Sequence, residues 1–252
     1  MTQDKTENTG STNMQALVVG ARGGIGSALV RHWGQDSRFD TVWAVSRSGV
    51  ATTPVSESVH ALATDHSQSS MEETARLLAD EKSQLSRVVI ALGTLHTPAY
   101  SPEKSLDALT LAAMQEVYRV NCVLPLLWLS VLAPGLRKNP DCRIAVLSAR
   151  VGSIGDNGLG GWYSYRSAKA ALNMGLKSAS IEFARRAKGV KLIAFHPGTV
   201  ATELSAPFQR GVPEGKLFAP DFVAQRLDTL LNAHPADGQV SYLDWAGEPI
   251  PW

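Results

Sequence analysis

Short apolar runs alternate with helical segments along nearly the whole chain, and this alternation limits the possible folds more than any other feature. The apolar runs are typical of buried strands and cover residues 15–20, 41–46, 59–63, 87–92, 143–148, 190–195 and 239–243. Helices are predicted over 25–33, 69–82, 105–136 (two pieces, bent near Pro125), 165–188 and 221–233. Strands separated by helices imply right-handed βαβ units, and therefore an α/β fold with a parallel sheet of about seven strands. We predict a single doubly wound Rossmann-type domain.

The domain boundaries follow from length and local composition. A chain of 252 residues fits one large domain, and no internal stretch has the composition of a linker. Residues 1–13 are polar and are predicted to form a disordered tail. The domain then covers 14–252, with a substrate lid expected around 203–219.

Charge and cysteine content exclude several classes of protein. The net charge of +1 gives no electrostatic basis for binding DNA or RNA. The two cysteines lack zinc-ligand spacing and favour a reducing, cytoplasmic setting. No metal site is expected, because His96 and His196 have no third ligand at a suitable spacing. No apolar run is expected to be long enough to span a bilayer, and the most apolar stretch, 120–136, is predicted to be a buried or interface helix.

A glycine-rich loop follows the first predicted strand. Gly20 allows a tight exit from the strand, Gly24 lets backbone approach a pyrophosphate, and Gly26 lets the next helix pack closely. The helix begins at this loop, so its first amides, including that of Ile25, face the phosphates of a dinucleotide. A glycine turn in another kind of α/β protein is the alternative.

The end of the second strand distinguishes NADP from NAD. An NAD site would place Asp or Glu about twenty residues after the glycines, to bind the ribose 2′-hydroxyl. The chain has Ser46 and Arg47 there, and Arg22 lies in the loop itself. Guanidinium groups match a 2′-phosphate in charge and shape, so we predict NADP(H), with NAD(H) as the alternative. Asp65 after the third strand is a candidate adenine contact or an ordinary turn residue.

Tyr165 and Lys169 form the candidate catalytic pair. They are spaced i, i+4, so they share one face of a helix. A neighbouring ammonium lowers the pKa of a phenol, which allows the tyrosine to exchange a proton with a carbonyl or alcohol oxygen. Tyr163 is the alternative tyrosine, but the residue four positions later is Ser167.

Other residues at strand ends join this pair, and together they resemble the short-chain dehydrogenase/reductase family, in its C-factor-like branch. The resemblance covers 15–252. Its motifs are the glycine loop, Asn121, Ser148, the Tyr165–Lys169 pair, Pro197-Gly198 and Thr202.

The resemblance implies a role for each of these residues. Tyr165 would be the general acid, Lys169 would bind the nicotinamide ribose, Ser148 would hold the substrate oxygen, and Asn121 would support a water relay through its backbone. The remaining implied cofactor contacts are Ala91, Leu92 and Gly93 after the fourth strand, and Pro197, Gly198, Val200 and Thr202 after the sixth.

The chain departs from the family pattern at the serine. The family ends this strand in Ser-Ser-x-x-Gly with the second serine catalytic, whereas this chain reads Ser148-Ala149-Arg150-Val151-Gly152. Aligned on Gly152, the catalytic position is Ala149. Ser148 is the preferred candidate, and Ser153 or a site without a serine is the alternative.

These observations predict an NADP(H)-dependent oxidoreductase that interconverts a carbonyl and an alcohol. Apolar residues in the lid and in 94–100 and 153–162 favour a small apolar or aromatic substrate, although the lid residues could instead fill the lid's own core. A homodimer or homotetramer is expected from the apolar region 111–136 and the helix after Tyr165. The alternative is a C-factor-like dinucleotide-binding or signalling protein with little turnover.

Overall fold

The computed structural model describes residues 14–49, 56–80 and 84–252. The predicted disordered tail, 1–13, lies outside the described residues. Seven parallel strands form the central sheet in the order β3-β2-β1-β4-β5-β6-β9. They are β1 (Met14–Val19), β2 (Thr41–Ser46), β3 (Val59–Ala63), β4 (Gln84–Ile90), β5 (Cys142–Leu147), β6 (Val190–His196) and β9 (Val240–Asp244). The predicted doubly wound parallel sheet is confirmed.

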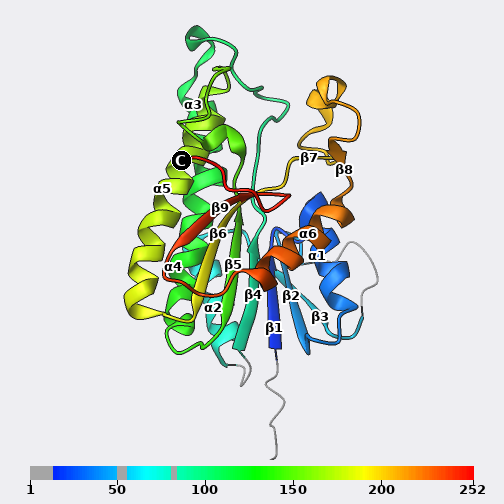
Figure 1. The fold of residues 1–252 in the computed structure, drawn as a ribbon, viewed down its shortest axis with the longest axis vertical. Coiled ribbons are helices and arrows are strands. Elements are labelled where there is room, and N and C mark those ends of the chain that lie inside the picture. The colour runs from blue at the N-terminus through cyan, green and yellow to red at the C-terminus, as the bar shows by residue number, and fades with distance from the viewer. Residues whose placement is uncertain (1–13, 50–55, 81–83) are drawn as a thin grey trace, which may run out of the picture.

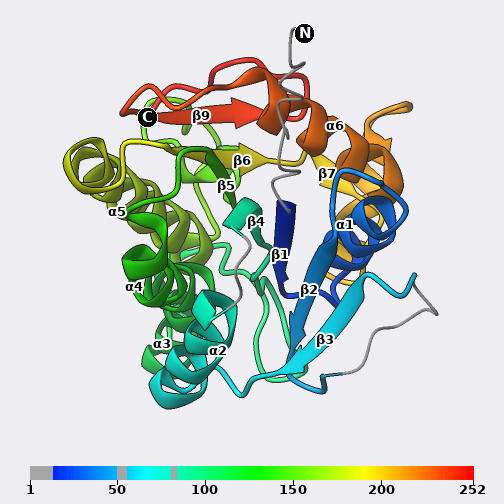
Figure 2. The same cartoon turned by 90° about the horizontal axis from the view of Figure 1, so that it is seen from below.

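Helices cover both faces of this sheet (Figures 1 and 2). One layer holds α1 (Gly24–Gly34) and α6 (Pro220–Ala233), and the other holds α2 (Gln68–Asp80), α3 (Leu111–Tyr118), α4 (Leu124–Leu136) and α5 (Tyr163–Arg186). The strand side chains divide into two cores accordingly. Leu17 and Ile144 face the α4–α5 layer, whereas Val18 and Ala145 face the α1–α6 layer. Alternate strand residues point to opposite faces, so both cores come from the same continuous apolar runs.

The edge strand and the lid differ from the sequence-based expectation. β3 is partly exposed along its length, because it lies at the edge of the sheet and only β2 pairs with it among the described strands. A second sheet that the pattern did not predict pairs β7 (Thr199–Val200) with β8 (Leu217–Phe218). The 3-10 helix η4 (Ala206–Gly211) lies between these two strands. The predicted lid segment is thus tied at both ends by a short pair of parallel strands.

The apolar region between β4 and β5 forms one long helical stretch. A π-helical turn, η2 (Arg119–Val123), joins α3 to α4, so the interruption lies just before Pro125. Residues Leu111–Leu136 are long and apolar enough to cross a membrane, with a mean hydropathy of 1.5, and 44% of that window is buried inside the protein. The expectation that no run has this length is therefore wrong by length and composition. Core helices of soluble proteins pass the same test, and α4 packs against α2, α5 and β4.

Candidate active site

The glycine loop lies at the carboxyl end of β1 and is shaped by close contacts. Gly20 has φ +88°, and a Cβ there would lie 2.7 Å from the carbonyl oxygen of Ala91. At Gly26 a Cβ would overlap the carbonyl oxygen of Gly20, so a glycine is required for α1 to start against the loop. At Gly24 a Cβ would overlap the methyl group of Thr202. Gly24 thus makes room for Thr202 and brings the loop and the segment after β6 together.

The first turn of α1 fits an anionic ligand. Within the described part of the chain, no side chain caps α1, and its first turn holds no acidic residue. Uncapped amides at a helix N-terminus attract phosphate groups through hydrogen bonds and the helix dipole. Arg22 in the loop is exposed and donates to the Ser48 hydroxyl at 2.9 Å. The loop and the end of β2 are therefore joined by the residue types that suit a ribose phosphate.

The neighbouring strand ends bring further candidate residues to this edge. Arg47 is exposed, whereas Ser46 is buried, and its carbonyl oxygen accepts from the Thr64 amide at 3.0 Å. The Asp65 carboxylate accepts from the Ser67 amide at 2.8 Å, and this hydrogen bonding holds its pKa below the ordinary value. Asp65 thus has the turn role that was one of its two readings, and its carboxylate is exposed.

The π-helical turn places Asn121 against the end of β4. Asn121 is fully buried; its Nδ2 donates to the carbonyl oxygens of Thr94 (2.8 Å) and Val117 (2.9 Å), and its Oδ1 accepts from the Thr94 amide (3.2 Å). Gly93 lies against this side chain, since a Cβ there would be 3.4 Å from Oδ1. π-helical turns are frequent at functional sites. Asn121 therefore fixes the segment that continues from Ala91 and Leu92.

Tyr165 and Lys169 lie one turn apart on the first part of α5. Lys169 is 2% exposed, its Nζ donates to the carbonyl oxygen of Leu147 at 2.7 Å, and it lies 5.7 Å from the centre of the Tyr165 ring. Gly152 packs on the stem of Lys169, where a Cβ would be 2.7 Å from the lysine Cβ. The 3-10 turn η3 (Arg150–Gly152) and the end of β5 thus hold the lysine toward the tyrosine.

Burial sets the protonation of this pair. Burial raises the pKa of the Tyr165 phenol above its ordinary value, and it lowers the pKa of Lys169 to about 7. The expectation that Lys169 lowers the phenol pKa is not met. The physical reason is that the ammonium is itself buried and only partly charged near neutral pH. In this environment Tyr165 is a neutral phenol, which is the form that donates a proton.

The three candidates for the serine position have different surroundings. Ser148 is buried and its hydroxyl donates to Oδ1 of Asn173 at 2.6 Å. Ala149 belongs to the cluster around Tyr165. The Ser153 hydroxyl accepts from the Asp156 amide at 3.0 Å. Ala149 thus shares a buried apolar cluster with Tyr165, and the assignment of Ser148 as the residue that holds the substrate oxygen stays a prediction.

The segment after β6 brings the lid beside the glycine loop. Gly198 has φ +74°, and a Cβ there would lie 2.7 Å from the Phe218 ring. The Ser205 hydroxyl donates to the carbonyl oxygen of Val200 at 2.5 Å, which closes the turn around Thr202. His196, before Pro197, is held neutral by burial, which lowers its pKa to about 4.

Aromatic side chains surround Tyr165 on the substrate side. The Trp162 ring lies 5.1 Å from that of Phe208 and 6.3 Å from that of Tyr165, centre to centre. Leu204 and Tyr100 pack on the same cluster, so the lid and the segment after β4 meet at the tyrosine. The other lid residues behave differently, because Phe218 packs 4.4 Å from Trp245 and 5.1 Å from Phe222. Phe218 thus fits the reading in which lid side chains fill the lid's own core, and the substrate contact of the other lid residues stays a prediction.

The sequence analysis did not identify three residues that form hydrogen bonds near the candidate site. Glu103 is buried and accepts from both the amide and the hydroxyl of Ser164, which anchors the start of α5. Tyr242 donates to the carbonyl oxygen of Ala149 at 2.6 Å. Asn173 could have been found, since it follows Lys169 by four residues on the same helical face. Glu103 and Tyr242 lie far away in sequence, and no local pattern marks them.

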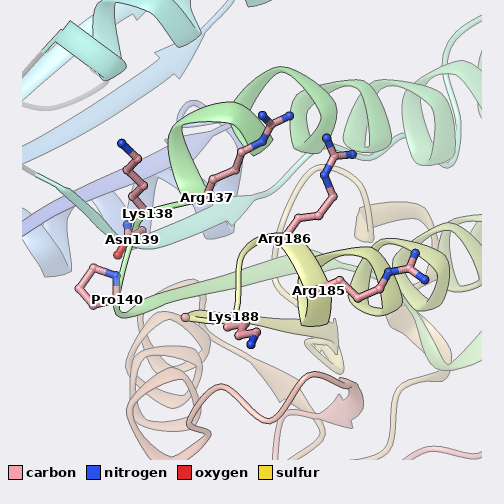
Figure 3. Close-up of a pocket in the computed structure, with 8 residues that line it drawn as sticks. Arg137, Lys138, Asn139, Pro140, Arg185, Arg186 and Lys188 are labelled. Carbon is pink, nitrogen blue, oxygen red and sulfur yellow. The ribbon is translucent and has the colours of Figure 1, made fainter.

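A basic hollow lies away from this site, where α4 and α5 end (Figure 3). Its volume is about 510 Å³, and its lining includes five basic residues: Arg137, Lys138, Arg185, Arg186 and Lys188. Cations near helix C-termini interact favourably with the helix dipole, and Arg186 also pairs with Glu182 at 2.8 Å. These basic residues lie near helix C-termini, at the end of the sheet opposite to the candidate site.

Comparison with known proteins identifies the family. A family model described as short chain dehydrogenase matches residues 14–212. The chain belongs to the short-chain dehydrogenase family. A relative named C-signal, from Myxococcus xanthus, is 35% identical over 141 residues, which are 56% of this chain and 80% of the relative. A 1-hydroxy-2-glutathionyl-2-methyl-3-butene dehydrogenase from a Rhodococcus species is 30% identical over 192 residues, covering 76% of this chain and 80% of the relative.

Solved structures of this family have the same fold. An NADPH-bound carbonyl reductase from chicken fatty liver superposes with a TM-score of 0.79 at 24% identity, over 95% of this chain and 99% of the reductase. The predicted family membership is thus confirmed, and the chain is a member of an oxidoreductase family.

Proposed function

We propose that this chain is an NADPH-dependent carbonyl reductase in which Tyr165 is the general acid. The observation that carries the proposal is the buried, neutral Tyr165 next to Lys169 at the end of β5. A neutral phenol can donate a proton to a carbonyl oxygen, whereas oxidation of an alcohol would need the phenolate.

The residues of the carboxyl edge fit the cofactor. The uncapped first turn of α1 would hold the pyrophosphate, and Arg22 with Arg47 would hold the 2′-phosphate. Gly93 lies close to Asn121, and Thr202 lies close to Gly24, so both could contact a cofactor that extends from this loop. The nicotinamide supplies the hydride, and the protein binds, orients and protonates. The NADPH-bound carbonyl reductase of the same fold supports this choice of cofactor.

The chain's own residues supply the proton and the orientation. Tyr165 is buried, with Trp162 beside its ring and Phe208 packed on Trp162. Lys169 lies beside that ring and is anchored on the carbonyl oxygen of Leu147. Loss of the phenol proton to the substrate oxygen leaves a phenolate, which Lys169 would stabilise in its protonated form.

A matched pair of variants tests the proposal. NADPH oxidation is followed with a panel of aldehydes, ketones and quinones. Tyr165→Phe removes only the hydroxyl, so NADPH binding should survive while turnover falls by about a hundred- to ten-thousand-fold. Tyr163→Phe is the control and should change turnover little. Full turnover by Tyr165→Phe on a substrate that the parent reduces would contradict the assignment.

A second function is favoured by one specific observation. Ala149 lies at Tyr165 where the family pattern has a serine, and a relative of this chain is named C-signal. A dinucleotide-binding or signalling protein with little turnover would tolerate that alanine. Tight NADPH binding without reduction of any carbonyl in the panel would establish this alternative instead.

A further inference from the structure

Five exposed basic side chains surround the hollow where α4 and α5 end (Figure 3). Two of them follow α4, and three lie at the end of α5 or just after it: Arg137, Lys138, Arg185, Arg186 and Lys188. Arg186 pairs with Glu182, whereas within the described ranges the other four side chains form no ion pair and donate no hydrogen bond. The whole chain has a net charge of only +1, so positive charge is concentrated at this end of the molecule and the remainder is net negative.

The floor of the hollow is held rigidly by backbone contacts. The turns before β5 and β6 lie side by side, and the amide of Cys142 donates to the carbonyl oxygen of Gly189 at 2.9 Å. A Cβ at Gly189 would overlap the carbonyl oxygen of Asn139 and the backbone of Pro140, so a glycine is needed for this approach. Asn139 is buried, and its Nδ2 donates to the carbonyl oxygen of Leu85 at 2.6 Å. The two helix ends are therefore fixed around the hollow before any ligand binds, which lowers the cost of binding.

The helix ends alone do not account for the positive charge. Two helix C-termini offset about one positive charge, since each helix dipole places about half a negative charge there. Glu182 offsets one more by pairing with Arg186, whereas Asp141 beside the α4 turn is paired with Arg143. About three of the five positive charges are thus uncompensated within the part of the chain that the structure describes. A hollow lined by one sign of charge attracts ions of the opposite sign.

We propose that this hollow binds the triphosphate group of a small molecule, either inorganic triphosphate or a nucleoside triphosphate. A triphosphate carries several negative charges on a short chain, which matches a surplus of about three positive charges. The volume of about 510 Å³ lies within the range of small-molecule sites, which is about 300–1,000 Å³. The three arginines can bind phosphate oxygens through two parallel hydrogen bonds each, and the two lysines add compact positive charges.

The distribution of charge favours a compact anion over a nucleic acid. Affinity for DNA or RNA grows with the number of phosphates that basic residues neutralise along the strand. Outside the hollow this chain is net negative, so an extended polyanion would gain little from its additional phosphates. The site is also remote from the candidate active site, and its test needs no catalytic activity.

Isothermal titration calorimetry of the full chain at low ionic strength tests the site, with sodium tripolyphosphate and magnesium-free ATP as the probes. The hollow variant, Arg137→Gln with Arg185→Gln, removes two guanidinium groups that have no partner within the described residues, so folding should be unchanged. Thermal unfolding without ligand checks this. The matched control, Lys104→Gln with Lys177→Gln, removes the same charge from exposed positions outside the hollow.

A second control addresses the cofactor cleft, where a phosphate could also bind. Arg22→Gln with Arg47→Gln removes the two exposed arginines there and should leave the affinity for tripolyphosphate nearly unchanged. A short DNA duplex serves as the extended polyanion.

Both probes should bind the parent, with an affinity that falls as salt is added. The hollow variant should lose at least about ten-fold in affinity, because charge-assisted hydrogen bonds are lost, and the matched control should lose much less. Tighter binding of ATP than of tripolyphosphate would assign the site to a nucleotide, and the reverse would assign it to inorganic triphosphate. Equal losses in the hollow variant and the matched control would overturn the proposal, as would loss confined to the Arg22/Arg47 variant. Tighter binding of the DNA duplex would also overturn it, and so would the absence of both binding heat and any rise in unfolding temperature with either probe.

Discussion

Replacing Lys169 with methionine should reveal the cost of burying its charge. Lys169 is 2% exposed, and within the described residues its ammonium forms no ion pair with a carboxylate; it donates to the carbonyl oxygen of Leu147. Burial lowers its pKa from 10.5 to about 7. Each pKa unit corresponds to about 1.4 kcal/mol, so the folded state loses at most about 5 kcal/mol when this group is charged.

The sign of the pH dependence follows from proton binding in the two states. Between about pH 7 and 10.5 the unfolded chain keeps the proton of Lys169 and the folded chain releases it. The free energy of unfolding therefore rises with pH across this window, by up to about 1.4 kcal/mol per pH unit. This gain in the free energy of unfolding is complete above the pKa of the lysine in the unfolded chain, and it is lost as the pH falls toward 7. Lys169→Met has no proton to release and lacks this slope.

Urea denaturation of the parent and of Lys169→Met at pH 7, 8 and 9 measures the difference. Both proteins contain the other groups that titrate in this range, so these largely cancel when the two curves are subtracted. Equal protein concentrations keep any oligomerisation comparable. The parent should gain stability relative to the variant as the pH rises. If the free energy of unfolding changed with pH equally in the two proteins, the reasoning that the buried ammonium lacks a compensating partner would be refuted.

Four further expectations can be checked directly. A charge-assisted contact with the 2′-phosphate should give the parent an affinity for NADP(H) about 10- to 100-fold higher than for NAD(H), and Arg47→Asp should erase this preference. Equal affinities of the parent for the two cofactors on titration would refute this expectation. Gly26→Ala should destabilise the fold by about 1–3 kcal/mol in chemical denaturation, whereas Gly135→Ala, with open space at its Cβ on α4, should stabilise it by about 0.5–1 kcal/mol; the opposite order would contradict the packing argument. Ser148→Ala should change turnover less than ten-fold, and a hundred-fold loss would restore this hydroxyl to the catalytic role. Sedimentation should show a homodimer or homotetramer that Ile181→Glu weakens, because Ile181 is 51% exposed on α5; a stable 27.0 kDa species at micromolar concentration would rule this out.

The order of elements and the parallel sheet could be predicted because they follow from local patterns. The strands β1, β2, β5 and β6 are continuous apolar runs buried on both faces, and their starts and ends agree with the predicted ones within one residue. The pair β7 and β8 could not be predicted in this way. Each of these strands has two residues and is too short to show a periodic pattern, and their pairing joins segments far apart in the sequence.

The candidate site was predictable where spacing along one element decides the geometry. Tyr165 and Lys169 share a helical face by their i, i+4 spacing, and the structure places them together. Their protonation was not predictable, because it depends on burial by η3, α3 and the lid, which meet only in the folded chain. Glu103 shows the same limit, since its contact with Ser164 joins residues that are 61 positions apart.

Whether Ser148 or Ala149 faces the candidate site depends on the alternation of side chains along the extended chain. Both residues follow β5 directly, and neighbouring positions of extended chain face opposite sides, so a reading shifted by one residue exchanges the two. In the folded protein the direction is set by contacts from distant elements: Asn173 takes the hydroxyl of Ser148, and Tyr242 on β9 takes the carbonyl oxygen of Ala149. These two hydrogen bonds hold the end of β5, where Ala149 belongs to the buried apolar cluster that contains Tyr165. Residues far away in the sequence therefore decide how Ser148 and Ala149 lie beside the candidate site.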